Sequence, residues 1–220
     1  MNPKAVIFDM DGVIFDSERA TFNGWQELAD KYGFECLEIP YRQCIGVNEA
    51  RSREIFLSFY GPDFPYDDLS REQSRNYHSR YDGGRLPQKP GVHALLTALR
   101  AAGYFIALAS STRTSTVTSQ LRDAGILPFF DRVIGGDMVE RSKPNPDIFL
   151  KALESTGIAP EDAVVIEDSF NGIRAAHRAG MIPVMVPDML EPDEEMRSLA
   201  RHILPDLNTV RALLCPEKGE

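Results

Sequence analysis

The sequence predicts an α/β protein: a doubly wound, parallel-sheet core of Rossmann-like type with an inserted helical cap domain. Three observations lead to this prediction. Short apolar runs that stop at polar residues alternate with segments of helical period, as in parallel sheets covered by helices on both faces. A purely helical stretch interrupts this alternation after the first apolar run. The length of 220 residues is enough for one such core and a small accessory module.

The first predicted strand is the continuous apolar run at residues 5–8, a pattern typical of a strand buried on both faces. The run stops at Asp9. From Ser17 onward, apolar residues recur at helical spacing until Gly33 ends the helix. Further helix is predicted over residues 41–81. This stretch of helix contains no strand that could join a sheet.

These helices are therefore predicted to form a separate cap. Within them, Gly61 and Pro65 mark breaks between helices. We place the cap at residues 16–85 and the α/β core at residues 1–15 and 86–220. Two linkers would join the parts, so the cap could swing over the core.

The rest of the chain alternates regularly between strand and helix. Strands are predicted at residues 104–109, 132–134, 163–166 and 182–186. The helices between them end before Gly103, Gly125, Gly157 and Gly180. Repeated strand–helix units of this kind predict a parallel sheet with helices on both faces.

Polar side chains follow four of the predicted strands, at or shortly after the point where each strand ends. They are Asp9 and Asp11 after the first, Ser110, Ser111 and Thr112 after the second, Ser142 and Lys143 beyond the third, and Glu167 and Asp168 after the fourth. Ligands of open parallel sheets bind beyond the carboxyl ends of the strands, so we expect these groups to meet at one edge.

This set of side chains points to phosphoryl transfer. Crowded carboxylates repel one another, and a cation relieves the repulsion. Oxygen ligands without His or Cys favour Mg²⁺ over zinc. A lysine and hydroxyls beside a divalent cation form a seat for a phosphoryl group. Asp9 could attack phosphorus to give an aspartyl-phosphate, while Asp11 handles the protons.

Each feature alone has a simpler explanation. An Asp-x-Asp-Gly sequence is a common turn, the hydroxyls at 110–112 could cap a helix, and Lys143 could lie on the surface. A phospho-accepting signalling domain also places Asp, Ser/Thr and Lys at strand ends. Asp11 and the cap argue against such a switch, because a switch needs neither a leaving-group acid nor a lid.

Composition narrows the partners and the compartment. The net charge of −9 disfavours phosphate backbones and anionic lipids, so neither nucleic acid nor membrane is expected as a partner. The chain has three cysteines, at positions 36, 44 and 215, and none of them forms a CxxC motif. An odd number without such a motif predicts free thiols, as expected for a protein of the reducing cytoplasm. We expect a cytoplasmic monomer that acts on a small phosphorylated metabolite.

The ordered motifs resemble the signatures of the haloacid dehalogenase-like superfamily. Phe-Asp-Met-Asp-Gly-Val at 8–13 resembles the first, Ser110 the second, Lys143 in Ser-Lys-Pro-Asn-Pro-Asp the third, and Glu-Asp-Ser-Phe-Asn-Gly at 167–172 the fourth. A helical cap directly after the first signature is typical of the branch that includes sugar-phosphate phosphatases and β-phosphoglucomutase. The resemblance covers essentially the whole chain.

The resemblance implies a role for each motif residue. Asp9 would be the nucleophile and a Mg²⁺ ligand. Asp11 would be the general acid/base and would offer its backbone carbonyl to the metal. Ser110 and the backbone amide of Ser111 would bind the phosphoryl group. Lys143 would hold the phosphoryl oxygens and restrain the Asp9 carboxylate.

The fourth signature would complete the metal site. Asp168 would be the remaining protein ligand of Mg²⁺, and Glu167 would coordinate the metal or support its ligands. Family members that cleave other bonds lack an acid/base aspartate at the position of Asp11, so its presence favours phosphate esters.

Two departures separate this chain from the mutases of the branch. Thr21 stands where those mutases usually carry His, and the cap loop around Glu49 lacks their Arg. These departures favour a phosphatase, with a phosphosugar mutase as the alternative. The loop residues Asn48 and Arg51 are predicted to contact the substrate, beside Gly46 and Glu49. An inert helix connection is the alternative explanation of this loop.

Overall fold

The computed structural model describes residues 3–47 and 49–216 and contains a six-stranded parallel sheet. The strand order is β3-β2-β1-β4-β5-β6. The strands are β1 Ala5–Phe8, β2 Phe105–Ala109, β3 Arg132–Ile134, β4 Ala163–Glu167, β5 Ile182–Met185 and β6 His202–Ile203. The predicted fold class and its five strands are confirmed. The sixth strand has two residues, too few to show a period in the sequence.

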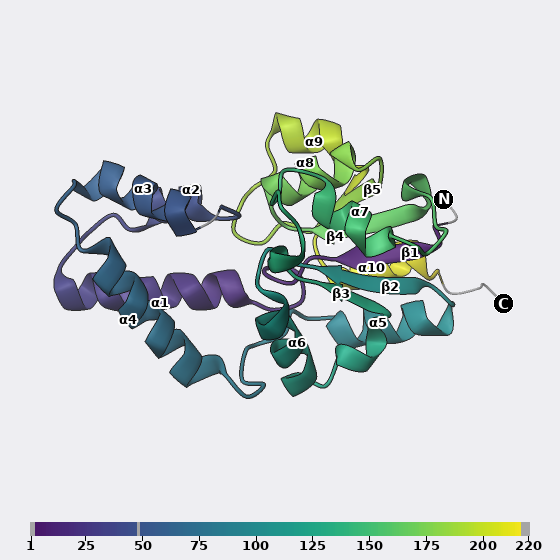
Figure 1. The fold of residues 1–220 in the computed structure, drawn as a ribbon, viewed down its shortest axis with the longest axis horizontal. Coiled ribbons are helices and arrows are strands. Elements are labelled where there is room, and N and C mark those ends of the chain that lie inside the picture. The colour runs from purple at the N-terminus through teal and green to yellow at the C-terminus, as the bar shows by residue number, and fades with distance from the viewer. Residues whose placement is uncertain (1–2, 48, 217–220) are drawn as a thin grey trace.

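Helices cover both faces of the sheet, as Figure 1 shows. On one face lie α5 Val92–Ala101, α6 Thr114–Asp123 and α10 Leu207–Leu214; on the other lie α7 Asp147–Leu153 and α8 Phe170–Arg178. The helix α9 Glu194–Leu199 and the short 3₁₀ helices Leu127–Phe129, Gly136–Met138 and Pro160–Asp162 complete the core. Side chains of β1 alternate between the faces: Val6 and Phe8 pack with the first group, Ala5 and Ile7 with the second.

Four helices follow β1 and form the cap. They are α1 Ser17–Tyr32, α2 Glu38–Cys44, α3 Glu49–Tyr60 and α4 Tyr66–Tyr81. The cap has its own apolar cluster, in which the Trp25 ring lies 4.8 Å from Phe56 and 5.6 Å from Tyr66 between ring centroids. It projects from the carboxyl end of the strands (Figure 1).

Both connections between cap and core run side by side. The amide of Asp16 donates to the carbonyl of Pro87 at 2.9 Å, and the amide of Lys89 donates to the carbonyl of Ile14 at 2.8 Å. The Lys89 ammonium also bonds Asp188, which follows β5, at 2.7 Å. The cap is thus attached through a short paired segment. The division at residues 16–85 stays a prediction.

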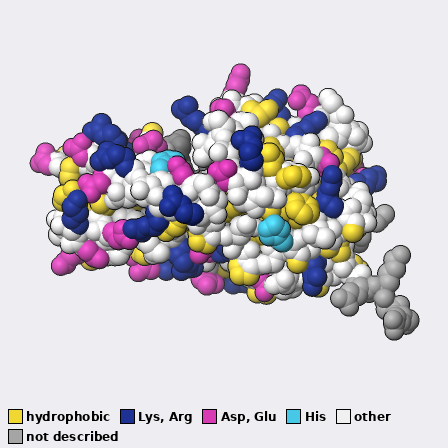
Figure 2. All heavy atoms as spheres, turned by 90° about the horizontal axis from the view of Figure 1, so that it is seen from below, with side chains coloured by type: hydrophobic (Ala, Val, Ile, Leu, Met, Phe, Trp, Pro, Cys, Tyr) yellow, Lys and Arg dark blue, Asp and Glu magenta, His cyan; other side chains and the backbone are white. Residues whose placement is uncertain are grey.

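No helix among the described residues is long and apolar enough to cross a membrane. Figure 2 shows Lys and Arg interspersed with Asp and Glu on the cap end of one face. That face carries charges of both signs rather than one continuous basic surface.

Candidate active site

A buried ion cluster lies at the carboxyl ends of β1 and β4. The Lys143 ammonium donates to Asp9 Oδ1, to Glu167 Oε1 at 2.8 Å and to the carbonyl of Ala109 at 3.1 Å. Strand register brings these groups together, because Phe8 of β1 pairs with Leu108 of β2 and Ile166 of β4. The residue that follows each of these three therefore lies at the same edge.

The cluster also contains three carboxylates that could hold a metal. Ligand atoms of Asp9, Glu167 and Asp168 lie within 4.8 Å of one another, and all three residues are buried. The Asp168 carboxylate accepts no hydrogen bond from any residue in the described part of the chain, whereas Glu167 is held by Lys143 and Ser169. One ammonium does not balance three buried carboxylates. An oxygen-only site with this deficit of positive charge fits Mg²⁺.

The same imbalance shifts the pKa values of the site. Burial, helped by Glu167 and Asp11 and opposed by Lys143, raises the pKa of Asp9 to about 8. Burial and the neighbouring carboxylates raise the pKa of Asp168 well above its usual range. Burial alone would lower the pKa of Lys143, but Asp9 and Glu167 raise it on balance, so the ammonium stays charged.

Mg²⁺ is expected to stabilise the protein more at about pH 8 than at about pH 6. The folded pKa of Asp9, about 8, lies above the usual 3.8. The metal-free fold therefore loses stability as the pH rises through that interval. Metal binding requires the carboxylate, so it releases protons and strengthens with pH. Thermal unfolding with and without MgCl₂ at both pH values measures this. An equal shift in Tm at the two would contradict it.

Asp11 lies two residues after Asp9 and is held by hydroxyl groups. Ser17 donates to its Oδ1 at 2.7 Å, and Thr112 donates to its Oδ2 at 3.1 Å. The Ser110 hydroxyl lies 3.4 Å from Oδ2 and also accepts from the amide of Thr112 at 3.0 Å. The fully buried Ser110 thus joins β1 and β2 beside the candidate acid/base.

A cavity of about 560 Å³ opens between this cluster and the cap. This volume lies within the usual range for small-molecule sites. From the core it is lined by the strand-end residues Asp9, Asp11, Ser111, Thr112, Arg113, Ser142, Lys143, Glu167, Asp168 and Ser169, and from the cap by Glu18, Cys44, Gly46, Val47 and Glu49. The structure therefore brings most of the predicted site residues around one cavity, beneath the predicted loop.

The predicted cap residues divide into three cases. Gly46 and Glu49 line the cavity, and the carbonyl of Gly46 accepts from Asn171 of the core at 2.9 Å. Arg51 does not line it; two residues after Glu49 on α3, a rotation of about 200°, it lies on another face of the helix, where its guanidinium pairs with Glu54 at 2.7 Å. Asn48 lies outside the described residues.

Glu18 is a cavity residue that the sequence reasoning did not identify. It lies in the first turn of α1, and its Oε2 is 3.4 Å from the hydroxyl of Tyr41. Burial, with Asp11 and Asp188 nearby, raises its pKa to about 7. In the sequence, Glu18 looks like an ordinary acidic residue in the first turn of a helix. Its place at the cavity becomes visible only in the structure, where α1 lies close to the sheet edge.

Two glycines leave space for the metal-site carboxylates. A Cβ added at Gly12, where φ is +76°, would lie 2.1 Å from Asp168 Oδ2. A Cβ added at Gly172 would lie 1.7 Å from Glu167 Oε1. Gly12 and Gly172 belong to the first and fourth sequence motifs, but the spacing within the motifs does not show which side chains the glycines accommodate.

Gly172→Ala is expected to displace Glu167 and to lower activity at least tenfold. The added methyl overlaps the carboxylate, and overpacking of this kind costs about 1–3 kcal/mol. The measurement is kcat together with the urea midpoint of unfolding. Gly24→Ala in α1 is the control, because its Cβ meets only the flexible end of Gln73 at 3.1 Å. Equal activity in both variants would contradict the role of Gly172.

Comparison with known proteins identifies the family. Residues 6–186 match the family described as haloacid dehalogenase-like hydrolase. The phosphorylated carbohydrates phosphatase of Thermotoga maritima is 34% identical over 180 residues, which cover 81% of this chain and 82% of that protein. The β-phosphoglucomutase of Bacillus subtilis is 32% identical over 195 residues, which cover 83% of each chain.

Solved structures show the same architecture. A haloacid dehalogenase family hydrolase from Deinococcus radiodurans R1, with bound phosphate and sodium, aligns with a TM-score of 0.80 and 28% identity over 97% of this chain and 95% of that one. The CbbY protein of Rhodobacter sphaeroides in complex with phosphate aligns with a TM-score of 0.72 and 27% identity, covering 93% and 95%. Sequence motifs, fold and relatives agree, and the chain belongs to the haloacid dehalogenase-like hydrolase family.

Proposed function

We propose that this protein is a Mg²⁺-dependent phosphatase of small phosphorylated metabolites, with sugar phosphates as the substrate class. One observation carries the proposal: Asp9, paired with Lys143, and Asp11 line the same cavity as the Asp168 carboxylate, which accepts no hydrogen bond from the described residues. The named phosphatases among the relatives, including that for phosphorylated carbohydrates, support this activity and substrate class.

In the first half-reaction, Asp9 attacks the phosphorus of the ester. A bond forms between its carboxylate oxygen and phosphorus, and the bond to the ester oxygen breaks. Asp11 gives its proton to that leaving oxygen. Lys143 and the amide of Ser111, both at the cavity, bind the phosphoryl oxygens, while the fully buried Ser110, predicted to share this role, lies behind them against Asp11. When bound at Asp9 and Asp168, Mg²⁺ supplies positive charge that neutralises the phosphoryl group.

In the second half-reaction, water hydrolyses the aspartyl-phosphate. Asp11, now a carboxylate, takes a proton from the water as its oxygen bonds to phosphorus. The bond between phosphorus and Asp9 breaks, which restores the carboxylate and yields inorganic phosphate. The hydroxyls of Ser17 and Thr112 orient Asp11 for both proton transfers.

The cap supplies the substrate-contacting surface in this proposal. Glu18 and Glu49 line the cavity from the cap side. Carboxylates are good partners for the hydroxyl groups of a sugar and poor partners for a second phosphate. We therefore favour a hydroxylated leaving group. The protein would act as a cytoplasmic monomer without nucleic acid or membrane as partner.

A phosphosugar mutase is the second candidate, because a β-phosphoglucomutase is among the relatives. Against it, Thr21 occupies the position where such mutases usually carry His. A phospho-accepting signalling domain without turnover is a third candidate. Asp11 at the cavity and the cap above it favour turnover over storage of an acyl phosphate.

The test is hydrolysis of p-nitrophenyl phosphate and of a panel of phosphorylated sugars, with MgCl₂ and with EDTA. We expect Mg²⁺-dependent release of phosphate from both. Absent or metal-independent turnover would overturn the proposal. Conversion of β-glucose 1-phosphate to glucose 6-phosphate with a bisphosphate primer would instead identify a mutase.

Asp11→Ala is expected to slow both half-reactions, by about 10²–10⁴-fold. Loss of the acid matters most for a sugar leaving group, because an alkoxide is a far poorer leaving group than p-nitrophenolate. The ratio of kcat for the two substrates in mutant and wild type measures this. An equal loss for both leaving groups would contradict protonation by Asp11.

A further inference from the structure

A second cavity lies beside Asp11. It has a volume of about 210 Å³ and shares Asp11, Glu18 and Thr112 with the main cavity. Its other walls are Met10, Ser17 and Thr21, Tyr77 and His78 of α4, and Thr116 and Gln120 of α6. We call it the side cavity. It touches the candidate acid/base without touching Asp9 or Lys143.

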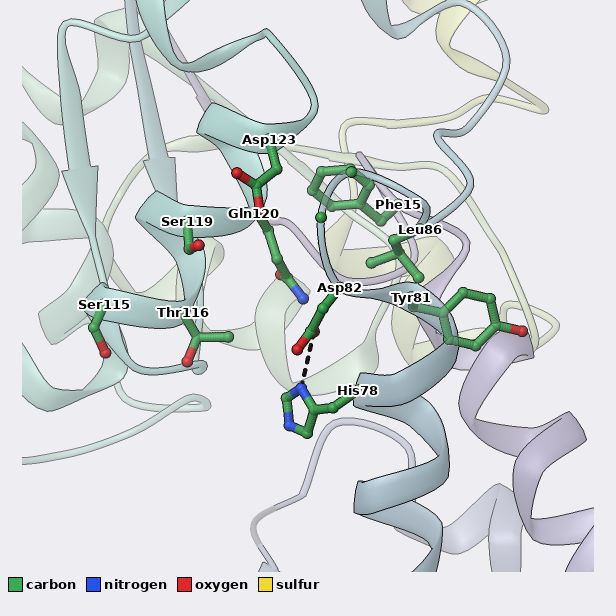
Figure 3. Close-up of a pocket in the computed structure, with 12 residues that line it drawn as sticks. Phe15, His78, Tyr81, Asp82, Leu86, Ser115, Thr116, Ser119, Gln120 and Asp123 are labelled. Atoms are coloured by element: carbon green, nitrogen blue, oxygen red, sulfur yellow. Dashed lines mark hydrogen bonds and ion pairs between the residues drawn. The ribbon is translucent and has the colours of Figure 1, made fainter.

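The side cavity has lining residues in common with a third space. This outer pocket of about 320 Å³ shares His78, Thr116 and Gln120 with the side cavity. Figure 3 shows it between one face of α6 and the end of α4, where His78 bonds Asp82. Thr116 and Gln120 therefore stand between the outer pocket and the side cavity, whose opposite wall is Asp11.

The side cavity is lined with groups that hold water. Three residues with hydroxyl groups, Ser17, Thr21 and Thr116, line the side cavity. The amide oxygen Gln120 Oε1 is buried and has no hydrogen-bond partner among the described residues. A buried acceptor of this kind is normally satisfied by water, and the side cavity is large enough to hold it. Hydroxyl groups both donate and accept, so they can pass water molecules inward.

We propose that a path through the outer pocket and the side cavity delivers the hydrolytic water to Asp11, separately from the opening used by the substrate. The inference rests on the proposed phosphatase function. After the first half-reaction, the leaving alcohol still lies in the main cavity beneath the cap. Once the alcohol oxygen has moved from the position opposite Asp9, water from the side cavity can move past Asp11 into that position, lose a proton to Asp11 and bond to phosphorus while the bond to Asp9 breaks. The path thereby favours hydrolysis over transfer to another sugar.

Thr116→Phe tests this path, because position 116 lies where the side cavity and the outer pocket meet. Thr118→Phe on the same helix is the matched control, since Thr118 is similarly half-buried and lines neither space. Gln120→Leu is a second variant of nearly unchanged volume that removes the unpartnered acceptor. The Tm of each variant verifies that it folds.

The protein is first phosphorylated once by ³²P-labelled p-nitrophenyl phosphate. The measurement is the rate at which the labelled protein then loses its ³²P, with p-nitrophenolate release followed in parallel. We expect Thr116→Phe to slow label loss about tenfold or more, with the first release of p-nitrophenolate unchanged, so that a burst of one per active site appears. Gln120→Leu should change in the same direction, and Thr118→Phe should behave as wild type.

Equal rates of label loss in wild type, Thr116→Phe and Gln120→Leu would overturn the path and would mean that water arrives through the main cavity. A slowing as large in Thr118→Phe would also overturn it. Failure of the proposed function looks different, because wild-type protein would then neither acquire label nor release p-nitrophenolate.

Discussion

Asp9→Asn is expected to abolish turnover, by about four orders of magnitude or more, while the protein stays folded. The amide has nearly the shape of the carboxylate but is not a nucleophile, so no acyl phosphate forms. The residue is 7% exposed and lies against Lys143, which keeps Glu167 as a partner. In metal-free buffer at about pH 8 the Tm should not fall. The cluster holds three carboxylates beside one ammonium, and the substitution removes one of the carboxylates in excess.

The experiment compares kcat, acid-stable ³²P labelling and Tm for wild type and Asp9→Asn. Asp63→Asn, at an exposed position in the turn between α3 and α4, is the control and should retain full activity. Residual turnover of Asp9→Asn above about one per cent of wild type would exclude the covalent route.

Lys143→Met is expected to lower both stability and activity, with the stability loss at about 3–5 kcal/mol. The substitution keeps an unbranched apolar stem and removes the ammonium that bonds Asp9, Glu167 and the carbonyl of Ala109. The buried carboxylates of Asp9 and Glu167 then lack the ammonium that neutralises part of their charge. The loss should be larger at about pH 8 than at about pH 5, because protonation of Asp9 relieves the repulsion at low pH.

Urea unfolding at the two pH values, with and without MgCl₂, measures this effect. Added MgCl₂ should restore part of the stability but not the activity, because it neutralises the carboxylates without replacing the phosphoryl contact. Lys4→Met is the control, since its pair with Asp162 is exposed and contributes little. A stability loss no larger than that of Lys4→Met would contradict the role of Lys143.

The strands were predictable because they are short, continuous apolar runs that need no partner to be recognised. The run before Asp9 and the run before Glu167 are buried throughout, as their composition implies. Their polar ends followed from the general geometry of parallel sheets. The helices α9 and α10 and the strand β6 were not predicted, because their apolar signal is confined to a few residues near the end of the chain.

Side-chain direction in the cap was not predictable. Glu18 and Arg51 both begin cap helices in charged sequence, yet Glu18 lines the cavity and Arg51 pairs with Glu54 on the surface. A helix turns by about 100° per residue, so a shift of one position moves a side chain to another face. Which face meets the core depends on how the cap helices pack, and the Trp25 cluster joins residues of all four cap helices.

The sequence by itself determined the α/β class and the order in which acidic, hydroxyl and ammonium groups follow the strands, because strand burial and motif spacing are local properties of the chain. Only the tertiary structure decided that the Asp168 carboxylate accepts no hydrogen bond within the described part of the chain, that Gly12 makes room for Asp168, and that Thr116 and Asp11 line one side cavity. Those features arise between segments up to about a hundred or more residues apart. Contacts and cavities between distant segments exist only once the sheet and the cap have packed.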